Sequence, residues 1–132
     1  MESQIIEIPR FFDKRGSLSF IENDTLLPFN IERVFWIYDV PGGEDRGGHA
    51  YRETEEFIVA LSGSFDVVLD DGKNNVQVFH LNRSYYGLYV PKMIWRQMKE
   101  FSTNSVAMVL ASTSYHTEDY LRNYEEFKII AR

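Results

Sequence analysis

Short runs of alternating hydrophobic and polar residues follow one another along most of this chain. A period of two is typical of strands with one buried face. In 64–81 the pattern continues on both sides of an Asp71-Gly72 turn, with alternating hydrophobic residues at Phe65, Val67, Leu69, Val76 and Val78. This pattern predicts a β-hairpin. Further strands are predicted in 3–8, 16–22, 31–40, 49–61, 85–91, 94–101 and 105–112. Short strands at this spacing indicate an all-β sandwich or barrel.

The C-terminal segment has a different pattern. In 117–128, Thr117 is placed to cap a helix whose first turn carries Glu118 and Asp119, the charges that favour a helix N-terminus. The apolar and aromatic positions then fall on one helical face, at Tyr120, Leu121, Tyr124 and Phe127. We therefore expect one short C-terminal helix, with this face packed against the β-barrel.

Composition restricts the class of protein further. The 132 residues contain no repeat and no linker, so we expect a single domain over 1–132. The net charge of −6 argues against a nucleic-acid-binding protein, and the absence of cysteine excludes disulfides and thiolate metal sites. The N-terminus has no signal-peptide pattern, and no apolar run is long enough to span a membrane. We therefore expect a cytoplasmic protein.

The stretch Gly43–Gly63 carries the strongest motif in the chain. Its spacing, Gly-x5-His-x-His-x4-Glu-x6-Gly, resembles the first cupin motif, whose two histidines and glutamate bind a metal. Here the second histidine is replaced by Tyr51, while His49 and Glu56 are kept. Residues two apart on a strand point to the same face, so His49 and Tyr51 should lie together in a barrel lumen. The resemblance implies a small cupin-type β-barrel, or jelly roll.

The second half of the cupin pattern, Pro-x-Gly-x2-His, is altered in "PKMIWR". Arg96 occupies the ligand position, and arginine has no lone pair to give a metal. We therefore expect neither a metal nor another cofactor. Instead, His49 can take and give a proton near neutral pH, Tyr51 can donate one, and Arg46 or Arg96 can stabilise an enolate or hold a phosphate. This set suits proton abstraction next to a carbonyl, although a histidine in a barrel can also be a hydrogen-bonded core residue.

Four longer stretches resemble the nucleotide-sugar 3,4-ketoisomerases, the FdtA/QdtA-like, WxcM-type cupins. They are "DKRGSLSFIE", "PFNIERVFWIYDVPGGEDRGGHAYR", "GLYVPKMIWRQMKEFS" and "VLASTSYHTEDYLRNYEEF". The resemblance implies conversion of dTDP-4-keto-6-deoxyglucose to the 3-keto sugar, on the way to 3-amino sugars. It also implies a homodimer, which in this family often exchanges an N-terminal strand. The apolar segment 3–12 is suited to such an exchange.

The resemblance also assigns candidate site residues. His49 and Tyr51 are the catalytic candidates. The candidates for binding the nucleotide sugar are four arginines for the diphosphate and two aromatic residues for packing on a ring, namely Arg15, Arg33, Arg46, Arg96, Trp95 and Phe35. The family usually has "RGxHAH", and tends to have a tyrosine in place of Phe35.

These departures affect the proton-transfer step. A tyrosine with an ordinary pKa near 10 is a poor base at pH 7. Three outcomes follow: His49 carries both transfers, Tyr51 works as an acid or relay, or the protein binds a nucleotide sugar without isomerising it. A 3,5-epimerase-type activity on the same class of substrate is the remaining alternative.

Overall fold

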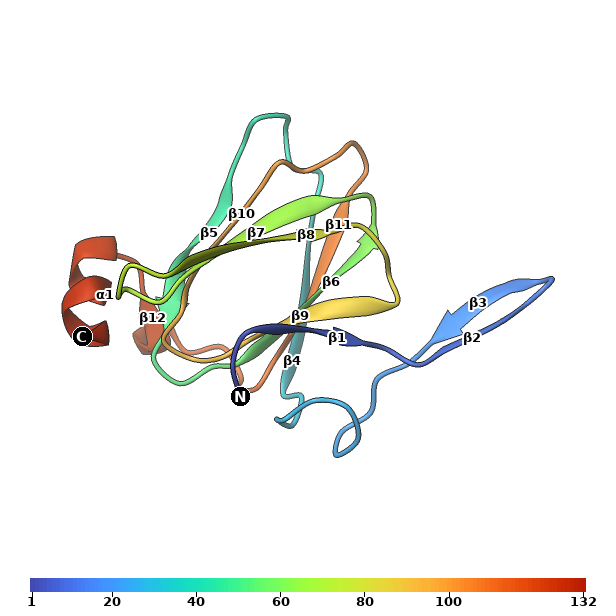
Figure 1. The fold of residues 1–132 in the computed structure, drawn as a ribbon, viewed down its shortest axis with the longest axis horizontal. Coiled ribbons are helices and arrows are strands. Elements are labelled where there is room, and N and C mark those ends of the chain that lie inside the picture. The colour runs from blue at the N-terminus through green and yellow to red at the C-terminus, as the bar shows by residue number, and fades with distance from the viewer.

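The structure is a computed structural model that describes all residues, 1–132. Two five-stranded antiparallel sheets pack face to face, and a two-stranded hairpin extends away from them (Figure 1). The first sheet has the order β1-β9-β6-β11-β4, with bounds Gln4–Glu7, Tyr86–Val90, Glu56–Ser62, Val106–Ala111 and Arg33–Tyr38. The second has the order β12-β5-β10-β7-β8, with bounds Tyr120–Leu121, Arg46–Tyr51, Trp95–Lys99, Phe65–Asp70 and Val76–Leu81. The extended hairpin is formed by β2 (Arg10–Asp13) and β3 (Gly16–Ser19).

This architecture confirms the predicted all-β, cupin-type fold with one C-terminal helix. The predicted hairpin forms as β7 and β8, with Phe65 opposite Leu81 and Asp70 opposite Val76. The predicted strand 49–61 forms as two strands, β5 and β6, because a loop over residues 52–55 separates them. No helix in the structure has the length and apolarity needed to cross a lipid bilayer.

The main core lies between the two sheets, where side chains from alternate strand positions meet. Its eleven buried members are Ile58, Ala60, Phe65, Val67, Leu69, Leu81, Leu88, Val90, Met98, Ala107 and Val109. A second cluster forms on the outer face of the first sheet, where Leu27 and Phe29 pack on Phe57 and Leu110. Burial of these side chains is the main favourable contribution to folding, because apolar surface is removed from water.

The C-terminal helix is shorter than the sequence predicts. Only Tyr124–Ala131 forms α1, and its N-cap is Asn123, whose side chain accepts from the Glu126 N–H at 2.9 Å. Thr117–Asp119 is a single 3-10 turn, and the next two residues form strand β12. The prediction that 117–128 is one helix is therefore wrong: its apolar pattern suited a helix, but pairing with β5 holds Tyr120 and Leu121 extended.

Candidate functional site

The candidate site lies at one end of the space between the sheets, where the inward-facing positions change from apolar to polar. On β6 the inward residues run from Ala60 through Ile58 to Glu56, and on β10 from Met98 to Arg96. Arg96 lies directly opposite His49 of β5, so the two side chains share the inward face. Glu56, Arg96 and His49 are 1%, 2% and 8% exposed, respectively. Three polar side chains are thus buried together where a core would otherwise continue.

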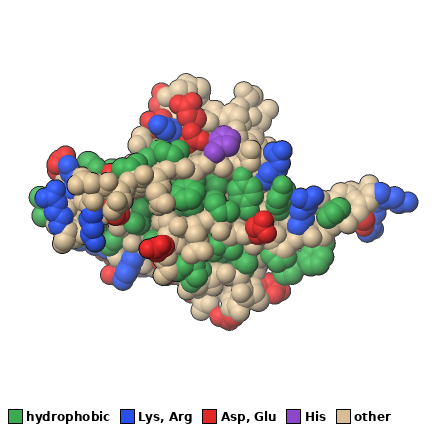
Figure 2. Space-filling view, in the orientation of Figure 1, with side chains coloured by type: hydrophobic (Ala, Val, Ile, Leu, Met, Phe, Trp, Pro, Cys, Tyr) green, Lys and Arg blue, Asp and Glu red, His purple; other side chains and the backbone are tan.

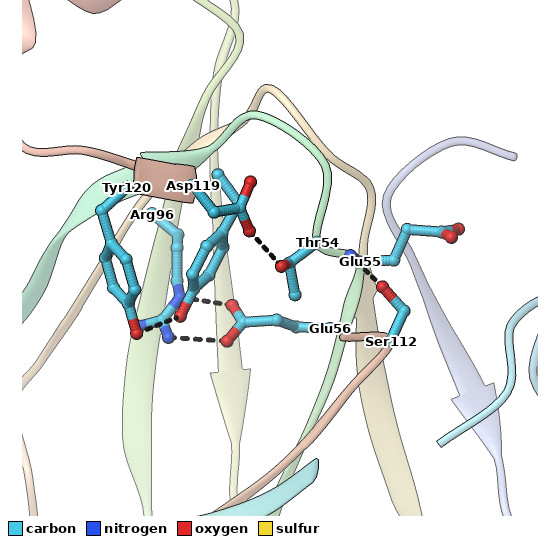
Figure 3. Close-up of polar contacts among 8 residues, drawn as sticks. Thr54, Glu55, Glu56, Arg96, Ser112, Asp119 and Tyr120 are labelled. Carbon is cyan, nitrogen blue, oxygen red and sulfur yellow. Dashed lines mark hydrogen bonds and ion pairs between the residues drawn. The ribbon is translucent and has the colours of Figure 1, made fainter. Parts of the chain in front are cut away.

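A bidentate ion pair joins two of them (Figure 3). The Arg96 Nε donates to Glu56 Oε1 at 2.6 Å, and Arg96 Nη2 donates to Glu56 Oε2 at 2.9 Å. Burial pushes the pKa of Arg96 down, but the Glu56 carboxylate and Tyr51 together outweigh this effect and raise the pKa above its ordinary value. Arg96 therefore remains a cation, as expected for a guanidinium.

The same ion pair bears on metal binding, because Glu56 and Arg96 occupy two of the cupin ligand positions. Both Glu56 oxygens accept from Arg96, whose nitrogens have no lone pair for a metal. No cluster of three or more His, Cys, Asp or Glu side chains exists that could hold an ion. This donor set does not fit a divalent metal, which needs three or more imidazole, thiolate or carboxylate ligands.

Gly47 makes room for this arrangement. A Cβ at this position would lie 2.3 Å from Arg96 Nη1, and the backbone has φ +79°, a conformation that side-chain-bearing residues rarely adopt. The Arg96 Nη1 atom is buried and has no hydrogen-bond partner in the structure. It therefore remains as a buried donor beside His49 after the ion pair with Glu56 is made.

His49 is held in its neutral form. Burial, followed by the positive charges of Arg96, Arg122 and Arg33, lowers the pKa of His49 from 6.5 to about 3. Its Nε2 atom is buried without a hydrogen-bond partner. Buried polar atoms normally have a partner, so this imidazole nitrogen is available to accept a hydrogen bond or a proton. Neutral imidazole is the form that accepts a proton.

Tyr51 lies beside His49, as the two-residue spacing predicts. The ring centroids are 4.8 Å apart and nearly perpendicular. Burial, the Glu56 charge and Tyr120 raise the pKa of Tyr51, although Arg96 opposes them. Its hydroxyl donates to the Tyr120 hydroxyl at 3.4 Å. Tyr51 therefore stays protonated at neutral pH and can act only as a hydrogen-bond or proton donor in the resting site.

Arg33 and Phe35, the candidates on β4, lie at the same end of the barrel. The Arg33 guanidinium is 5.4 Å from the centre of the Phe35 ring and 5.6 Å from that of Tyr115. Its Nε is buried without a hydrogen-bond partner. Arg33 has no carboxylate within ion-pair distance, and its charge acts on His49, so it suits an anionic ligand.

The structure corrects the expectation for Trp95. Successive residues on a strand point to opposite faces, so Trp95 points outward because Arg96 points inward. Its ring packs under α1, 5.2 Å from Tyr124 and 5.7 Å from Phe127. In this position Trp95 holds the helix on the barrel and cannot pack on a ligand next to His49.

Two of the candidate arginines are not gathered around His49. Arg15 lies at the turn of the β2–β3 hairpin, which extends away from the barrel, and its Nη2 pairs with Asp13 at 2.6 Å (Figure 1). A role of Arg15 in binding the diphosphate therefore stays a prediction. Arg46 is exposed at the start of β5, and its charge is not among those that lower the pKa of His49.

Two further residues lie next to His49, and no local sequence pattern predicted either of them. Arg122 follows β12, and its guanidinium lies 4.3 Å from the centre of the Tyr120 ring. Its charge acts on His49, and it has no carboxylate partner within ion-pair distance. Tyr120 packs 5.0 Å from His49 and 4.8 Å from Tyr51. Its place in a helical aromatic pattern indicated core packing, because nothing local indicated the pairing of β12 with β5.

The chain is similar to several known proteins over almost its whole length. The curated TDP-4-oxo-6-deoxy-alpha-D-glucose-3,4-oxoisomerase of Aneurinibacillus thermoaerophilus is 44% identical over 128 residues, which cover 97% of this chain and 91% of that protein. A crystal structure of a 3,4-ketoisomerase from Helicobacter canadensis has 38% identity and a TM-score of 0.95, covering 99% of this chain and 98% of the other. QdtA, a sugar 3,4-ketoisomerase from Thermoanaerobacterium thermosaccharolyticum solved with TDP, has 32% identity and a TM-score of 0.95, covering 98% and 94%.

A family-level match covers the chain from end to end. The model of the family described as "FdtA: WxcM-like, C-terminal" matches residues 1–132. Together with a relative at 44% identity over 97% of the chain, this match settles the family. The chain belongs to the FdtA, or WxcM-like, family.

Proposed function

We propose that this chain is a TDP-sugar 3,4-ketoisomerase that moves protons with its own side chains and without a metal. The observation that carries the proposal is a buried, neutral His49 whose Nε2 has no partner, next to two tyrosine hydroxyls and an unpaired Arg96 nitrogen. Relatives with this activity at 44% and 38% identity support it. An isomerisation of this kind needs a general base and hydrogen-bond donors that stabilise an enolate oxygen.

The chemistry assigns a role to His49. Isomerising a 4-keto sugar requires the C3 proton to leave, an enediolate to form across C3 and C4, a proton to arrive at C4, and the hydroxyl proton to move from O3 to O4. Neutral His49 takes the C3 proton through Nε2, and the resulting imidazolium returns a proton to C4. The imidazole ends as it began, so the cycle needs no oxidant, reductant or cofactor. The Arg96 Nη1 donor lies beside His49, where it stabilises the negative charge that develops on the substrate oxygen.

The site also suits a substrate that carries a diphosphate. Arg33 and Arg122 both act on His49 by charge, and neither has an acidic partner within the chain. Guanidinium groups bind phosphate oxygens through paired donors. A bound diphosphate would offset these two charges, which would raise the pKa of His49 and make it a stronger base once the substrate is present. TDP, the group bound in the QdtA structure, carries this charge.

Arg122→Gln is expected to weaken TDP binding by about 10- to 100-fold, since a hydrogen bond to a charged group contributes about 1.5–3 kcal/mol. Isothermal titration calorimetry with TDP measures the affinity of both proteins, and the difference between them should become smaller as the salt concentration is raised. Arg52→Gln is the matched control, because Arg52 lies on the surface 3.8 Å from Glu126 and is already paired. Equal affinities for the two variants would remove Arg122 from the binding site.

The activity itself is tested by incubating the purified protein with TDP-4-keto-6-deoxyglucose in D2O and following the sugar by NMR. The expected result is a 3-keto product with deuterium at C4, and recovered substrate with exchange confined to C3. TDP binding with no exchange at C3 would identify a non-catalytic binding protein instead. Exchange at C5 as well as C3 would identify an epimerase-type activity.

We further propose that the protein is a cytoplasmic homodimer. Figure 2 shows hydrophobic side chains reaching the surface across the barrel and along the extended hairpin. Exposed apolar residues on β4 and the hairpin include Val34, Trp36, Tyr38, Phe11, Phe12 and Leu18. A hollow of about 770 Å³ opens beside Val34, and ten of its fifteen lining residues are hydrophobic. An exposed apolar surface of this kind favours a protein partner. Light scattering should give twice the chain mass of 15.5 kDa.

Strand exchange between the subunits stays a prediction, because β1 pairs with β9 of its own chain.

A further inference from the structure

Tyr120 is brought to the site by a strand of only two residues. In β12, Tyr120 lies opposite Tyr51 and Leu121 lies opposite Ala50. Directly opposed residues of an antiparallel pair point to the same face, so Tyr120 faces inward with Tyr51 while Leu121 packs outward on Phe127. The pairing of β12 with β5 therefore positions the Tyr120 hydroxyl among the inward-facing polar groups.

The turn before β12 is fixed by Asp119 (Figure 3). Its carboxylate accepts from the Thr54 hydroxyl, as Figure 3 shows. The same carboxylate accepts from the Glu53 N–H at 2.7 Å, and the Asp119 carbonyl accepts from the Arg52 N–H at 2.9 Å. Asp119 is itself buried. These bonds tie Thr117–Asp119 to the loop between β5 and β6, the same loop that follows Tyr51. The position of Tyr120 relative to Tyr51 is thereby held from both sides.

Three rings form a closed triangle. The centroid distances are 4.8 Å for His49–Tyr51, 5.0 Å for His49–Tyr120 and 4.8 Å for Tyr51–Tyr120. The Tyr51 hydroxyl donates to the Tyr120 oxygen, and no group in the structure accepts the Tyr120 hydrogen. The three rings therefore offer two groups to a substrate. His49 Nε2 can accept a proton from a carbon atom, and the half-buried Tyr120 has a hydroxyl hydrogen that no other group accepts.

We propose that Tyr120 is a catalytic residue, which together with Tyr51 carries the proton from O3 to O4 of the sugar while His49 moves the carbon-bound proton. This inference rests on the proposed ketoisomerase function. As the enediolate forms, Tyr120 gives its hydrogen to O4 and takes the Tyr51 hydrogen, and Tyr51 takes the hydrogen of O3. Each phenol ends with one hydrogen, the C4 carbonyl has become a hydroxyl, and the C3 hydroxyl has become a carbonyl.

The spacing of the two phenols suits this relay. Their oxygens are 3.4 Å apart, and oxygens on adjacent sugar carbons are separated by about a hydrogen-bond length. One phenol can therefore face each sugar oxygen. The relay also accounts for the tyrosine at position 51: because its hydroxyl stays protonated, Tyr51 can replace the proton that Tyr120 gives away.

Tyr120→Phe tests the proposal, because it keeps the ring and removes only the hydroxyl. With TDP-4-keto-6-deoxyglucose in D2O, kcat for isomerisation should fall by about 10²-fold, with little change in KM. The variant should still exchange the C3 proton of recovered substrate, so the ratio of exchange to product should rise above that of the wild type. This ratio reports the fate of the enediolate, which a merely structural role of Tyr120 would not change.

Tyr124→Phe is the matched control, because it removes a phenol hydroxyl from the same C-terminal segment. The Tyr124 hydroxyl donates to the Asp70 carboxylate at 2.5 Å and is not part of the group of rings around His49. It should keep the wild-type kcat and exchange ratio. If Tyr120→Phe fails to fold, fluorotyrosine at position 120 keeps the ring and the hydroxyl and makes the phenol a stronger acid. The basic limb of the kcat–pH profile should then move to lower pH.

The outcomes separate the two proposals. A wild-type protein that forms no 3-keto sugar refutes the proposed function. If the wild-type protein isomerises the sugar and Tyr120→Phe is equally fast, the role of Tyr120 is refuted while the proposed function stands. The same holds if Tyr120→Phe is slower but has an unchanged ratio of exchange to product. A pH profile unmoved by fluorotyrosine would do the same.

Discussion

His49→Gln is expected to lower kcat for 3,4-ketoisomerisation by about 10³-fold, which is within the range for losing a general base. The glutamine amide can occupy the position of Nε2 but cannot accept a proton from carbon at neutral pH. Because the other groups around the substrate are donors or cations, no neighbour can take over as base. Exchange at C3 in D2O should fall by the same factor as product formation, since both depend on removing the C3 proton.

The protonation state of His49 gives a second readout. In the free protein its pKa is lowered to about 3, so kcat/KM should stay level as the pH falls from 7 to 5, where an ordinary histidine near 6.5 would become protonated. NMR of labelled histidine should give a higher pKa after TDP is added, because the diphosphate offsets Arg33 and Arg122. An acid limb near 6.5 in kcat/KM, or a variant that still exchanges C3 at the wild-type rate, would contradict the assignment.

The lowered pKa of His49 also makes the stability of the folded protein depend on pH. The unfolded chain binds a proton on His49 below about 6.5, whereas the folded chain does not until about 3. The contribution of His49 to stability is therefore present above 6.5 and is lost as the pH falls from 6.5 toward 3. His49→Gln should reduce this loss in urea unfolding.

Glu56→Gln is expected to lower the free energy of unfolding by about 3–5 kcal/mol, because it leaves the Arg96 guanidinium buried without an opposite charge. Both side chains are almost completely buried, at 1% and 2% exposure, so water cannot replace the lost partner. Urea unfolding followed by circular dichroism measures the change. A loss under 1 kcal/mol would mean that the site relaxes to admit water.

A double replacement separates the cost of a broken pair from the value of the pair itself. Glu56→Leu combined with Arg96→Met removes both charges and keeps apolar volume, so most of the stability should return. The double variant should also raise the pKa of His49, because the Arg96 charge is one of the causes that lower it. If the double variant is no more stable than Glu56→Gln, the ion pair stabilises the barrel by itself.

Much of the barrel follows from local pattern. Alternation with a period of two predicts the β7–β8 hairpin and the shared face of His49 and Tyr51, because successive side chains on a strand point to opposite sides whatever their surroundings. The same rule, applied once Arg96 is seen to face inward, places Trp95 under the helix. From the sequence alone, either of these two neighbours could have been the inward one.

The remaining part of the site depends on contacts that no local pattern carries. A helical pattern in 117–128 made Tyr120 a packing residue, but pairing with β5, 69 residues away, places its hydroxyl on Tyr51. Pairing across 40 residues likewise turns two cupin ligand positions into the Glu56–Arg96 ion pair. The sequence by itself determined the barrel, the family and His49 with Tyr51, because these follow from spacing along single strands and from motif resemblance. Only the tertiary structure decided on Tyr120 and Arg122, because distant segments meet according to sheet register rather than according to local residue order.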